Sequence, residues 1–112
     1  MRILLTGGAG FIGCNLADRL AREGEHVLVL DSLARAGTEE NITWLQRRHP
    51  RRVSWLSADI RERDAGDAVT QASAVIHLAA QVAVTTSIEE PLADLDVNLR
   101  GTALLLEAAR RS

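Results

Sequence analysis

The chain has 112 residues, of which 46% are hydrophobic and 25% charged, with a formal net charge of −2. This length suits one small domain with a core of its own, and the near balance of charge argues against nucleic-acid and membrane-surface partners. A single cysteine excludes an internal disulfide framework and fits a reducing cytoplasm, where we expect the protein, and no apolar run approaches the roughly 20 residues that span a bilayer.

The first half of the chain predicts two strands, each followed by a helix. The strands are RILLT and HVLVLD, and the second is continuously apolar, which is typical of a parallel sheet covered on both faces. The first helix should bury a face that carries Ile12, Leu16 and Leu20. In chain order, these strands and helices span residues 2–6, 11–24, 26–31 and 38–50.

The second half predicts two further units of the same kind. RVSWLSAD and SAVIHLAA are the strands, and the helix between them is weak because Gly66 interrupts it. The last segment predicts one long helix that begins near Pro91. In chain order, the elements span residues 52–59, 61–72, 73–80 and 87–111.

Four strand–helix units in succession predict an α/β fold with a parallel sheet, right-handed crossovers and helices on both faces. The expected strand order is 3-2-1-4. This order is the first half, and a little more, of a doubly wound Rossmann-type fold. The chain contains no linker, repeat or low-complexity tract, so we expect one domain over residues 1–112.

The stretch TGGAGFIG lies between the first strand and the first helix. Gly7 permits a tight turn, Gly10 would let a pyrophosphate approach the backbone, and Gly13 would let the helix pack closely on the strand. The N–H groups of Phe11 and Ile12 at the start of the helix favour an anion. A plain strand–helix turn is the alternative. A Walker-type phosphate loop is excluded, because the chain has no lysine.

Asp31 ends the second strand, close to the spacing of roughly 20 residues expected for the acid that binds an adenosine ribose. A carboxylate there would repel a 2′-phosphate and favour NAD over NADP, although Arg35 could accommodate that phosphate. Asp31 could also simply cap the following turn. At the end of the third strand, Asp59 could accept the adenine amino group while Ile60 covers the ring. The alternative for Asp59 is to cap the helix that follows, and the two roles are compatible.

Four stretches resemble the extended short-chain dehydrogenase/reductase family, the NAD-dependent nucleotide-sugar epimerases and dehydratases. They stand in the family's order, cover essentially the whole chain, and are TGGAGFIG, VLDSLARAG, SADIRERD and the segment from VIHLAAQ to LLLEAAR. Within the family, DSLARAG, NITWL and QVAVTTSIEEP most resemble the CDP-paratose 2-epimerase branch, although related sugar epimerases and decarboxylases share most of these pieces. The resemblance implies NAD as cofactor and a nucleotide-diphosphate sugar as substrate of the full-length enzyme, which acts by transient oxidation of a sugar hydroxyl.

The resemblance also assigns positions along the cofactor. Asn98 would lie near the nicotinamide half, unless it is a polar residue satisfied within the helices. Three hydroxyl residues would face the sugar, with a solvated loop and helix N-cap as the alternative: Thr85, Thr86 and Ser87. The full set of expected cofactor contacts is Gly7, Gly10, Phe11, Ile12, Gly13, Asp31, Ser32, Arg35, Asp59, Ile60, Leu78, Ala79, Ala80, Gln81 and Asn98.

The remaining titratable residues predict no chemistry. His77, at a strand end, favours a hydrogen-bonded structural role over acid–base work, and we expect Cys14 to be packed and inert. His26 and His49 flank predicted elements, and we expect both to be exposed. No cluster has the spacing of metal ligands, so we expect no metal site.

In this family a Tyr-x-x-x-Lys pair moves the proton, and this chain has no tyrosine and no lysine. We therefore expect no catalytic residue and no turnover from this chain, which would be the N-terminal cofactor-binding part of an enzyme whose catalytic and substrate-binding part is absent. Two alternatives stay open: a stand-alone dinucleotide-binding module without turnover, and a degenerate interaction domain that binds nothing. We also expect self-association through the leucine-rich final helix or an exposed sheet edge.

Overall fold

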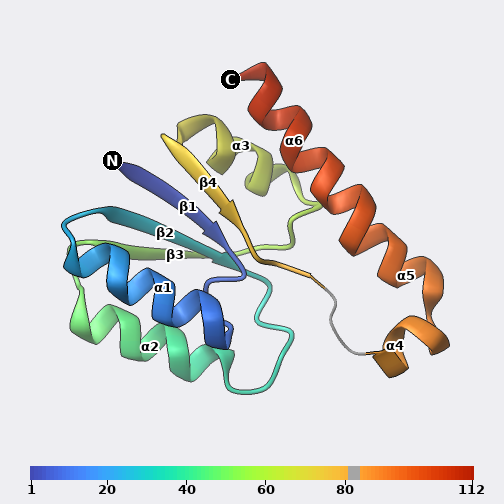
Figure 1. Ribbon diagram of the computed structural model, residues 1–112, viewed down its shortest axis with the longest axis horizontal. Coiled ribbons are helices and arrows are strands. Elements are labelled where there is room, and N and C mark those ends of the chain that lie inside the picture. Colours follow the sequence, from blue (N-terminus) through green and yellow to red (C-terminus); the bar gives the residue numbers. More distant parts are fainter. Residues whose placement is uncertain (81–83) are drawn as a thin grey trace.

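The computed structural model describes residues 1–80 and 84–112. Four parallel strands form one sheet in the order β3-β2-β1-β4, which confirms the predicted order and direction (Figure 1). The last two strands, β3 and β4, end before the residues where their predicted ranges end. The bounds of the four strands are Arg2–Thr6 for β1, His26–Asp31 for β2, Val53–Ser57 for β3 and Ala74–His77 for β4.

The register of the strands brings their carboxyl ends to one edge of the sheet. Thr6, the last residue of β1, pairs with Leu30 of β2 and with His77 of β4. Asp31 at the end of β2 pairs with Ser57 at the end of β3. The four connections that follow these strands therefore start side by side, which is where parallel α/β sheets bind their ligands.

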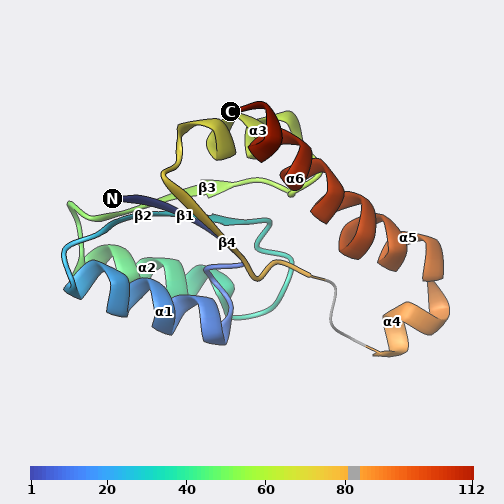
Figure 2. The same cartoon turned by 45° about the horizontal axis from the view of Figure 1, so that its top comes forward.

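Helices cover both faces of the sheet, as predicted. Helices α1 (Phe11–Arg22) and α2 (Thr38–Arg48) lie on one face, and α3 (Arg63–Gln71) and α6 (Thr102–Arg111) lie on the other (Figure 2). Alternate residues of a strand point to opposite faces, so neighbouring leucines in β1 enter different cores. Leu5 packs in the cluster under α1 and α2, and Leu4 packs in the cluster under α3 and α6.

The buried face of α1 differs from the one expected. Ile12 is 68% exposed, and Leu16 and Leu20 are only partly buried at the rim of the core. Small side chains let the helix axis lie close to the sheet, so they occupy the contact and the larger ones are displaced to its edge. The buried residues are Gly13, Cys14, Ala17, Asp18 and Ala21.

Helix α3 runs through Gly66 without a break, so the expected interruption is wrong. A Cβ atom at position 66 would lie 3.8 Å from the Cβ of Ala108 in α6. Tertiary packing of α3 on α6 therefore outweighs the cost of about 1 kcal/mol that glycine imposes on a helix. Gly66 lies where α3 packs on α6, and a methyl group there would be in ordinary van der Waals contact.

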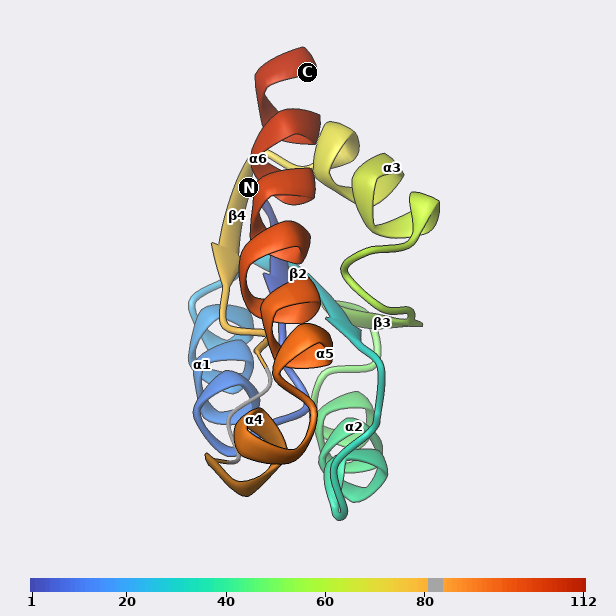
Figure 3. The ribbon, with the colours of Figure 1, turned by 90° about the vertical axis from the view of Figure 1, so that its right-hand side faces the viewer.

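The final segment is helical from Pro91 onward, as expected, but it is not a regular α-helix. The segment α5 (Pro91–Leu95) continues into the π-helical turn η1 (Asp96–Gly101) and then into α6. A separate short helix, α4 (Val84–Glu89), precedes it and turns away at Glu90, whose φ of −134° and ψ of 68° are not helical (Figure 3). Single π turns inside helices are rare and frequently mark functional sites.

Asp18 joins α1 to the end of α2. Its Oδ1 accepts hydrogen bonds from His49 Nε2 at 2.7 Å and from Arg48 Nε at 3.1 Å, and its Oδ2 lies 3.3 Å from Arg22 Nε. These donors hold the pKa of the Asp18 carboxyl below its usual range, although burial acts in the opposite sense. The His49 side chain is 12% exposed, so the expectation that it is exposed is wrong, whereas His26 is exposed as expected.

Candidate functional site

Two hollows of similar volume open at opposite ends of the strands. One, of about 370 Å³, lies at the carboxyl ends and is lined by the glycine turn and by residues that follow β2, β3 and β4. The other, of about 380 Å³, lies at the amino ends and is lined in part by the exposed side chains of Arg2, Arg51 and Arg52. Open α/β sheets bind ligands outside the carboxyl ends of their strands, so the first hollow is the candidate site.

The turn between β1 and α1 forms one wall of this hollow. Gly7 has a φ of +71°, which favours glycine, and its carbonyl oxygen accepts the N–H of Gly10 at 3.1 Å. The first intrahelical bond runs from the N–H of Cys14 to the carbonyl oxygen of Gly10 at 2.9 Å. The N–H groups of Phe11 and Ile12 precede that bond at the positive end of the helix dipole, where an anion is stabilised.

Gly10 and Gly13 have different roles in this turn. A Cβ atom at Gly13 would lie 2.3 Å from the carbonyl oxygen of Gly7, whereas a Cβ atom at Gly10 would meet nothing nearer than that oxygen, at 3.4 Å. The absent side chain of Gly13 therefore lets α1 pack against the backbone of the turn, rather than against the strand as expected. Gly10 lines the hollow and has room for a small side chain.

Asp31 sits where β2 ends and faces the glycine turn. Its Oδ2 accepts the N–H of Ala9 at 3.1 Å, and its Oδ1 accepts the N–H of Leu33 at 2.8 Å. The bond from Leu33 is the cap of the following turn that the sequence offered as an alternative role for Asp31. The bond from Ala9 fixes the neighbouring glycine turn. A carboxylate offers about four acceptor positions, so two remain for hydroxyl donors in the hollow.

Asp59 follows β3 and is held by Arg61. Its Oδ1 accepts the backbone N–H of Arg61 at 2.9 Å and Nε at 2.8 Å, and its Oδ2 accepts a terminal guanidinium N–H at 2.6 Å. These bonds hold the pKa of the Asp59 carboxyl below its usual range. Helix α3 begins at Arg63 with Glu62 as its N-cap residue, so the helix-cap alternative for Asp59 is wrong. The carboxylate instead closes the turn that precedes the helix.

His77 lies at the end of β4 in a chain of hydrogen bonds. Thr102 Oγ1 donates to the carbonyl oxygen of Asn98 at 2.8 Å, so it accepts from His77 Nε2 at 3.0 Å. The N–H of Leu78 donates to Thr6 Oγ1 at 3.1 Å, and that hydroxyl then donates to His77 Nδ1 at 2.5 Å. The network requires a neutral ring with its proton on Nε2, and burial lowers the pKa of His77 accordingly.

The hollow gathers most of the residues expected at a cofactor. It also has lining residues that sequence reasoning missed, of which two directly precede expected site residues at strand ends. The missed residues are Leu30, Ala34, Thr38, Ala58 and Val97. The expected residues that line it are Gly7, Gly10, Phe11, Ile12, Gly13, Asp31, Ser32, Arg35, Asp59, Ile60, Leu78, Ala79 and Ala80.

Four expected site residues among those that the structure describes do not line the hollow. Asn98 is exposed on η1, where its side-chain amide donates to Asp94 Oδ1 at 3.3 Å, and its neighbour Val97 lines the hollow instead. Gln81 lies outside the described residues. The three residues expected to face a sugar lie on α4, away from the hollow lining, and their role stays a prediction: Thr85, Thr86 and Ser87.

The described residues contain no group of three or more His, Cys, Asp or Glu side chains that could hold a metal ion. In the same part of the chain, no helix has both the length and the apolar character needed to cross a membrane. The hollow is lined by a glycine turn, two carboxylates at or just beyond strand ends, two hydroxyl side chains, one arginine and apolar residues.

Residues 4–112 match the family described as GDP-mannose 4,6 dehydratase. The chain is 40% identical over 114 residues to the CDP-paratose 2-epimerase of Salmonella typhi, a match that covers 99% of this chain and 33% of that protein. It is 39% identical over 112 residues to the UDP-glucose 4-epimerase of Mycolicibacterium smegmatis, covering 98% of this chain and 35% of that protein. The chain thus spans about a third of the length of these curated relatives.

Solved structures share the fold. A UDP-glucose 4-epimerase from Stenotrophomonas maltophila, with bound NAD and formylated UDP-arabinopyranose, superimposes with a TM-score of 0.86 at 34% identity, over 98% of this chain and 33% of that one. The UDP-glucose 4-epimerase of Thermus thermophilus, in complex with NAD, gives a TM-score of 0.82 at 40% identity, over 99% of this chain and 34% of that one. The chain belongs to the NAD-dependent nucleotide-sugar epimerase/dehydratase family of the extended short-chain dehydrogenases/reductases.

Proposed function

We propose that the hollow at the carboxyl ends of the strands binds NAD, with its adenosine half between the ends of β2 and β3. The observation that carries this proposal is that the glycine turn, Asp31 and Asp59 line one hollow. The two free acceptor positions of Asp31 suit the two hydroxyls of an adenosine ribose. The N–H groups of Phe11 and Ile12 suit the pyrophosphate.

The proposed adenine position lies between Asp59 and Ile60. Ile60 is 4% exposed and offers an apolar wall, and Asp59 keeps one acceptor position for an exocyclic amino group. The cofactor would then pass the end of β4, where Leu78, Ala79 and Ala80 line the hollow. Two of these three residues are alanines, which would let a ribose approach the backbone closely.

The carboxylate of Asp31 favours NAD over NADP. Two unit charges 4 Å apart in water repel by about 1 kcal/mol, and a phosphate carries nearly two charges, so the expected preference is roughly tenfold or more. Arg35 lines the same hollow and would reduce this preference without reversing it, because its exposed guanidinium is free to remain in solvent.

The parent protein, we propose, is a nucleotide-sugar epimerase whose N-terminal cofactor-binding part this chain supplies. Bound NAD would supply the hydride acceptor for transient oxidation of a sugar hydroxyl. This chain would bind and orient that cofactor, and residues outside it would move the proton, since it contains no tyrosine or lysine. The stretches DSLARAG and NITWL, which most resemble the CDP-paratose 2-epimerase branch, favour a CDP-sugar as substrate.

A second copy of the chain is the proposed partner of the outer face of the final helical segment. This face exposes four leucines on α5, η1 and α6, with exposed fractions from 51% to 79%: Leu92, Leu95, Leu99 and Leu106. Exposed apolar patches mark association sites. The edge strand β4 is the alternative contact. We place the protein in the cytoplasm, on its composition and single cysteine.

Calorimetric titration with NAD and with NADP tests the proposed function. The unmutated chain should bind NAD at least about tenfold more tightly than NADP. Asp31→Asn should weaken the binding of NAD and narrow the difference in affinity between the two cofactors, because it removes the charge while keeping one acceptor oxygen. Asp64→Asn is the matched control, since Asp64 is exposed on α3 away from the hollow. Equal or tighter binding of NADP by the unmutated chain would contradict the assignment.

A further inference from the structure

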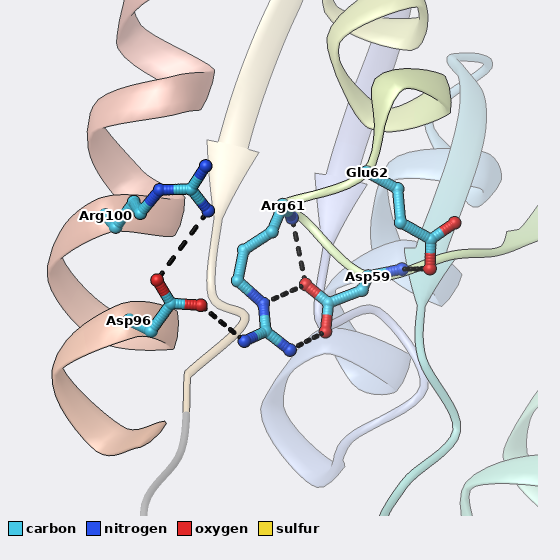
Figure 4. A network of polar contacts seen from close by, with 5 residues as sticks. All are labelled: Asp59, Arg61, Glu62, Asp96 and Arg100. Atoms are coloured by element: carbon cyan, nitrogen blue, oxygen red, sulfur yellow. Dashed lines mark hydrogen bonds and ion pairs between the residues drawn. The ribbon is translucent and has the colours of Figure 1, made fainter. Parts of the chain in front are cut away.

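Arg61 is bonded on two sides. Three of its N–H groups, one of them in the backbone, donate to Asp59, and its remaining terminal nitrogen donates to Asp96 Oδ2 of η1 at 2.6 Å (Figure 4). Arg100, one turn along η1, lies 3.6 Å from the other oxygen of Asp96. The guanidinium therefore joins the loop after β3 to the π-helical turn.

This arrangement leaves Asp59 with a single way to accept another donor. Both acceptor positions of Oδ1 and one of Oδ2 are filled by Arg61, so one position on Oδ2 remains. Glu62 Oε1 accepts the backbone N–H of Asp59 at 3.1 Å and fixes that residue from the opposite side. A carboxylate held in this way presents one free acceptor position in a fixed direction. A ligand group that donates a hydrogen bond to this position is favoured, and a ligand group that can only accept one is disfavoured.

The same turn of η1 also lies against the residue next to Asp59. A Cβ atom at Gly101 would be 2.5 Å from Cδ1 of Ile60, so the backbone of η1 packs directly on the Ile60 side chain. Asp96 and Gly101 mark the two ends of η1. The π-helical turn thus fixes Ile60 by contact and Asp59 through Arg61.

We propose that Arg61 is a positioning residue that sets the preference of this site for adenine, by aiming the one free acceptor of Asp59 from an anchor on η1. The inference rests on the proposed binding of NAD in this hollow. A planar guanidinium can hold one carboxylate with two parallel bonds and a second carboxylate at the same time, which a lysine ammonium cannot do. Arginine at this position is therefore part of base recognition, although it does not touch the base.

The test compares NAD with nicotinamide hypoxanthine dinucleotide, which carries a ring carbonyl in place of the adenine amino group. The unmutated chain should bind NAD roughly tenfold more tightly, the usual effect of one hydrogen bond to a charged group. Arg61→Lys keeps the charge and removes the planar geometry. The substitution should weaken the affinity for NAD roughly fivefold or more and change the affinity for the hypoxanthine analogue by less than about twofold. The preference for NAD over the analogue should therefore fall.

Two further variants separate positioning from general stability. Arg63→Lys makes the same chemical change at an exposed position two residues away and should leave both affinities unchanged. Asp96→Asn keeps the contact between Arg61 and Asp59 but removes the charge of Asp96, to which Arg61 is anchored. It should lower the preference for NAD over the hypoxanthine analogue by less than Arg61→Lys does. If circular dichroism shows that Arg61→Lys does not fold, Asp96→Asn becomes the test. A lowered preference for NAD in Asp96→Asn then supports the inference, and an unchanged preference overturns it.

Each outcome has a defined meaning. An unmutated chain that binds neither dinucleotide contradicts the proposed function itself. Binding of both with equal affinity leaves the proposed function standing and overturns the inference. A loss for Arg61→Lys that is equal for the two dinucleotides shows only a structural role and also overturns it. A reduced preference with retained binding of the hypoxanthine analogue supports it.

Discussion

Gly10 and Gly13, on either side of the start of α1, allow the effects on folding and on binding to be separated by the same chemical change, glycine to alanine. In Gly13→Ala, the new methyl group would lie 2.3 Å from the oxygen of Gly7 and 2.7 Å from Cα of Gly8, both of which are backbone atoms. No side-chain rotation can relieve these contacts, so the turn must move. In Gly10→Ala, the nearest atom is 3.4 Å away, and the φ of −75° and ψ of 177° are allowed for alanine.

The expected magnitudes differ accordingly. Overpacking costs about 1–3 kcal/mol, and a backbone obstacle puts Gly13→Ala at the upper end. Alanine returns about 1 kcal/mol of helix propensity inside α1, so the net loss is about 2 kcal/mol. At about 4–8 °C for each kcal/mol, Tm should fall by about 8–16 °C. Gly10→Ala changes an N-cap residue and should cost about 0.5 kcal/mol, or about 2–4 °C.

Thermal unfolding followed by circular dichroism, together with NAD titration well below Tm, measures both effects. Gly10→Ala should keep its fold and weaken NAD by about tenfold or more, because its methyl group enters the hollow where the pyrophosphate is proposed to lie. A Gly13→Ala chain with unchanged Tm would refute the packing geometry. Unchanged NAD affinity in Gly10→Ala would place the pyrophosphate elsewhere.

Three other outcomes are expected. Asp18→Asn, which weakens the contacts to His49 and Arg48, should lower the free energy of unfolding in urea by about 2 kcal/mol at pH 7. Because the pKa of Asp18 is lowered in the folded state, this difference should begin to shrink as the pH falls to about 4 and should disappear only below the lowered pKa, so a loss at pH 3 as large as that at pH 7 would contradict the ion-pair account. Nitrogen-15 NMR at pH 7 should find the His77 proton on Nε2, and a proton on Nδ1 would break the proposed network. Light scattering at tens of micromolar should show a dimer or larger assembly that Leu99→Glu dissociates, and the chain should not interconvert CDP- or UDP-sugars; a clean monomer or measurable turnover would contradict these expectations.

The strands were predictable because apolar runs in a parallel sheet are continuous, and HVLVLD matches β2 residue for residue. β4 is shorter than its apolar run. The N–H of Leu78 still donates to the carbonyl oxygen of Thr6 at 3.0 Å, but the N–H of Ala79 donates to the Thr6 hydroxyl at 3.2 Å. No local pattern reports a bond to a side chain on another strand. The end of β4 therefore needed the three-dimensional structure, whereas the ends of β1 and β2 did not.

The candidate site was predictable where a residue's role depends on its position relative to a strand end, as for Asp31 and Asp59. It was not predictable where a partner comes from a distant element. Arg61 forms an ion pair with Asp96, and His49 donates a hydrogen bond to Asp18. In both pairs the two residues come from elements that are far apart in the sequence. The π-helical turn η1 was missed for a different reason. The leucines before, within and after it follow the spacing of an ordinary helix: Leu95, Leu99 and Leu106.

Titration of the nitrogen-15-labelled chain with NAD, followed through its backbone amide resonances, tests the central claim most directly. The account predicts that the largest shifts occur at the carboxyl ends of the strands, at Phe11, Ile60 and Ala79. Shifts concentrated instead at Arg2 and Arg52, at the amino-end hollow, would contradict it, as would a spectrum that NAD leaves unchanged.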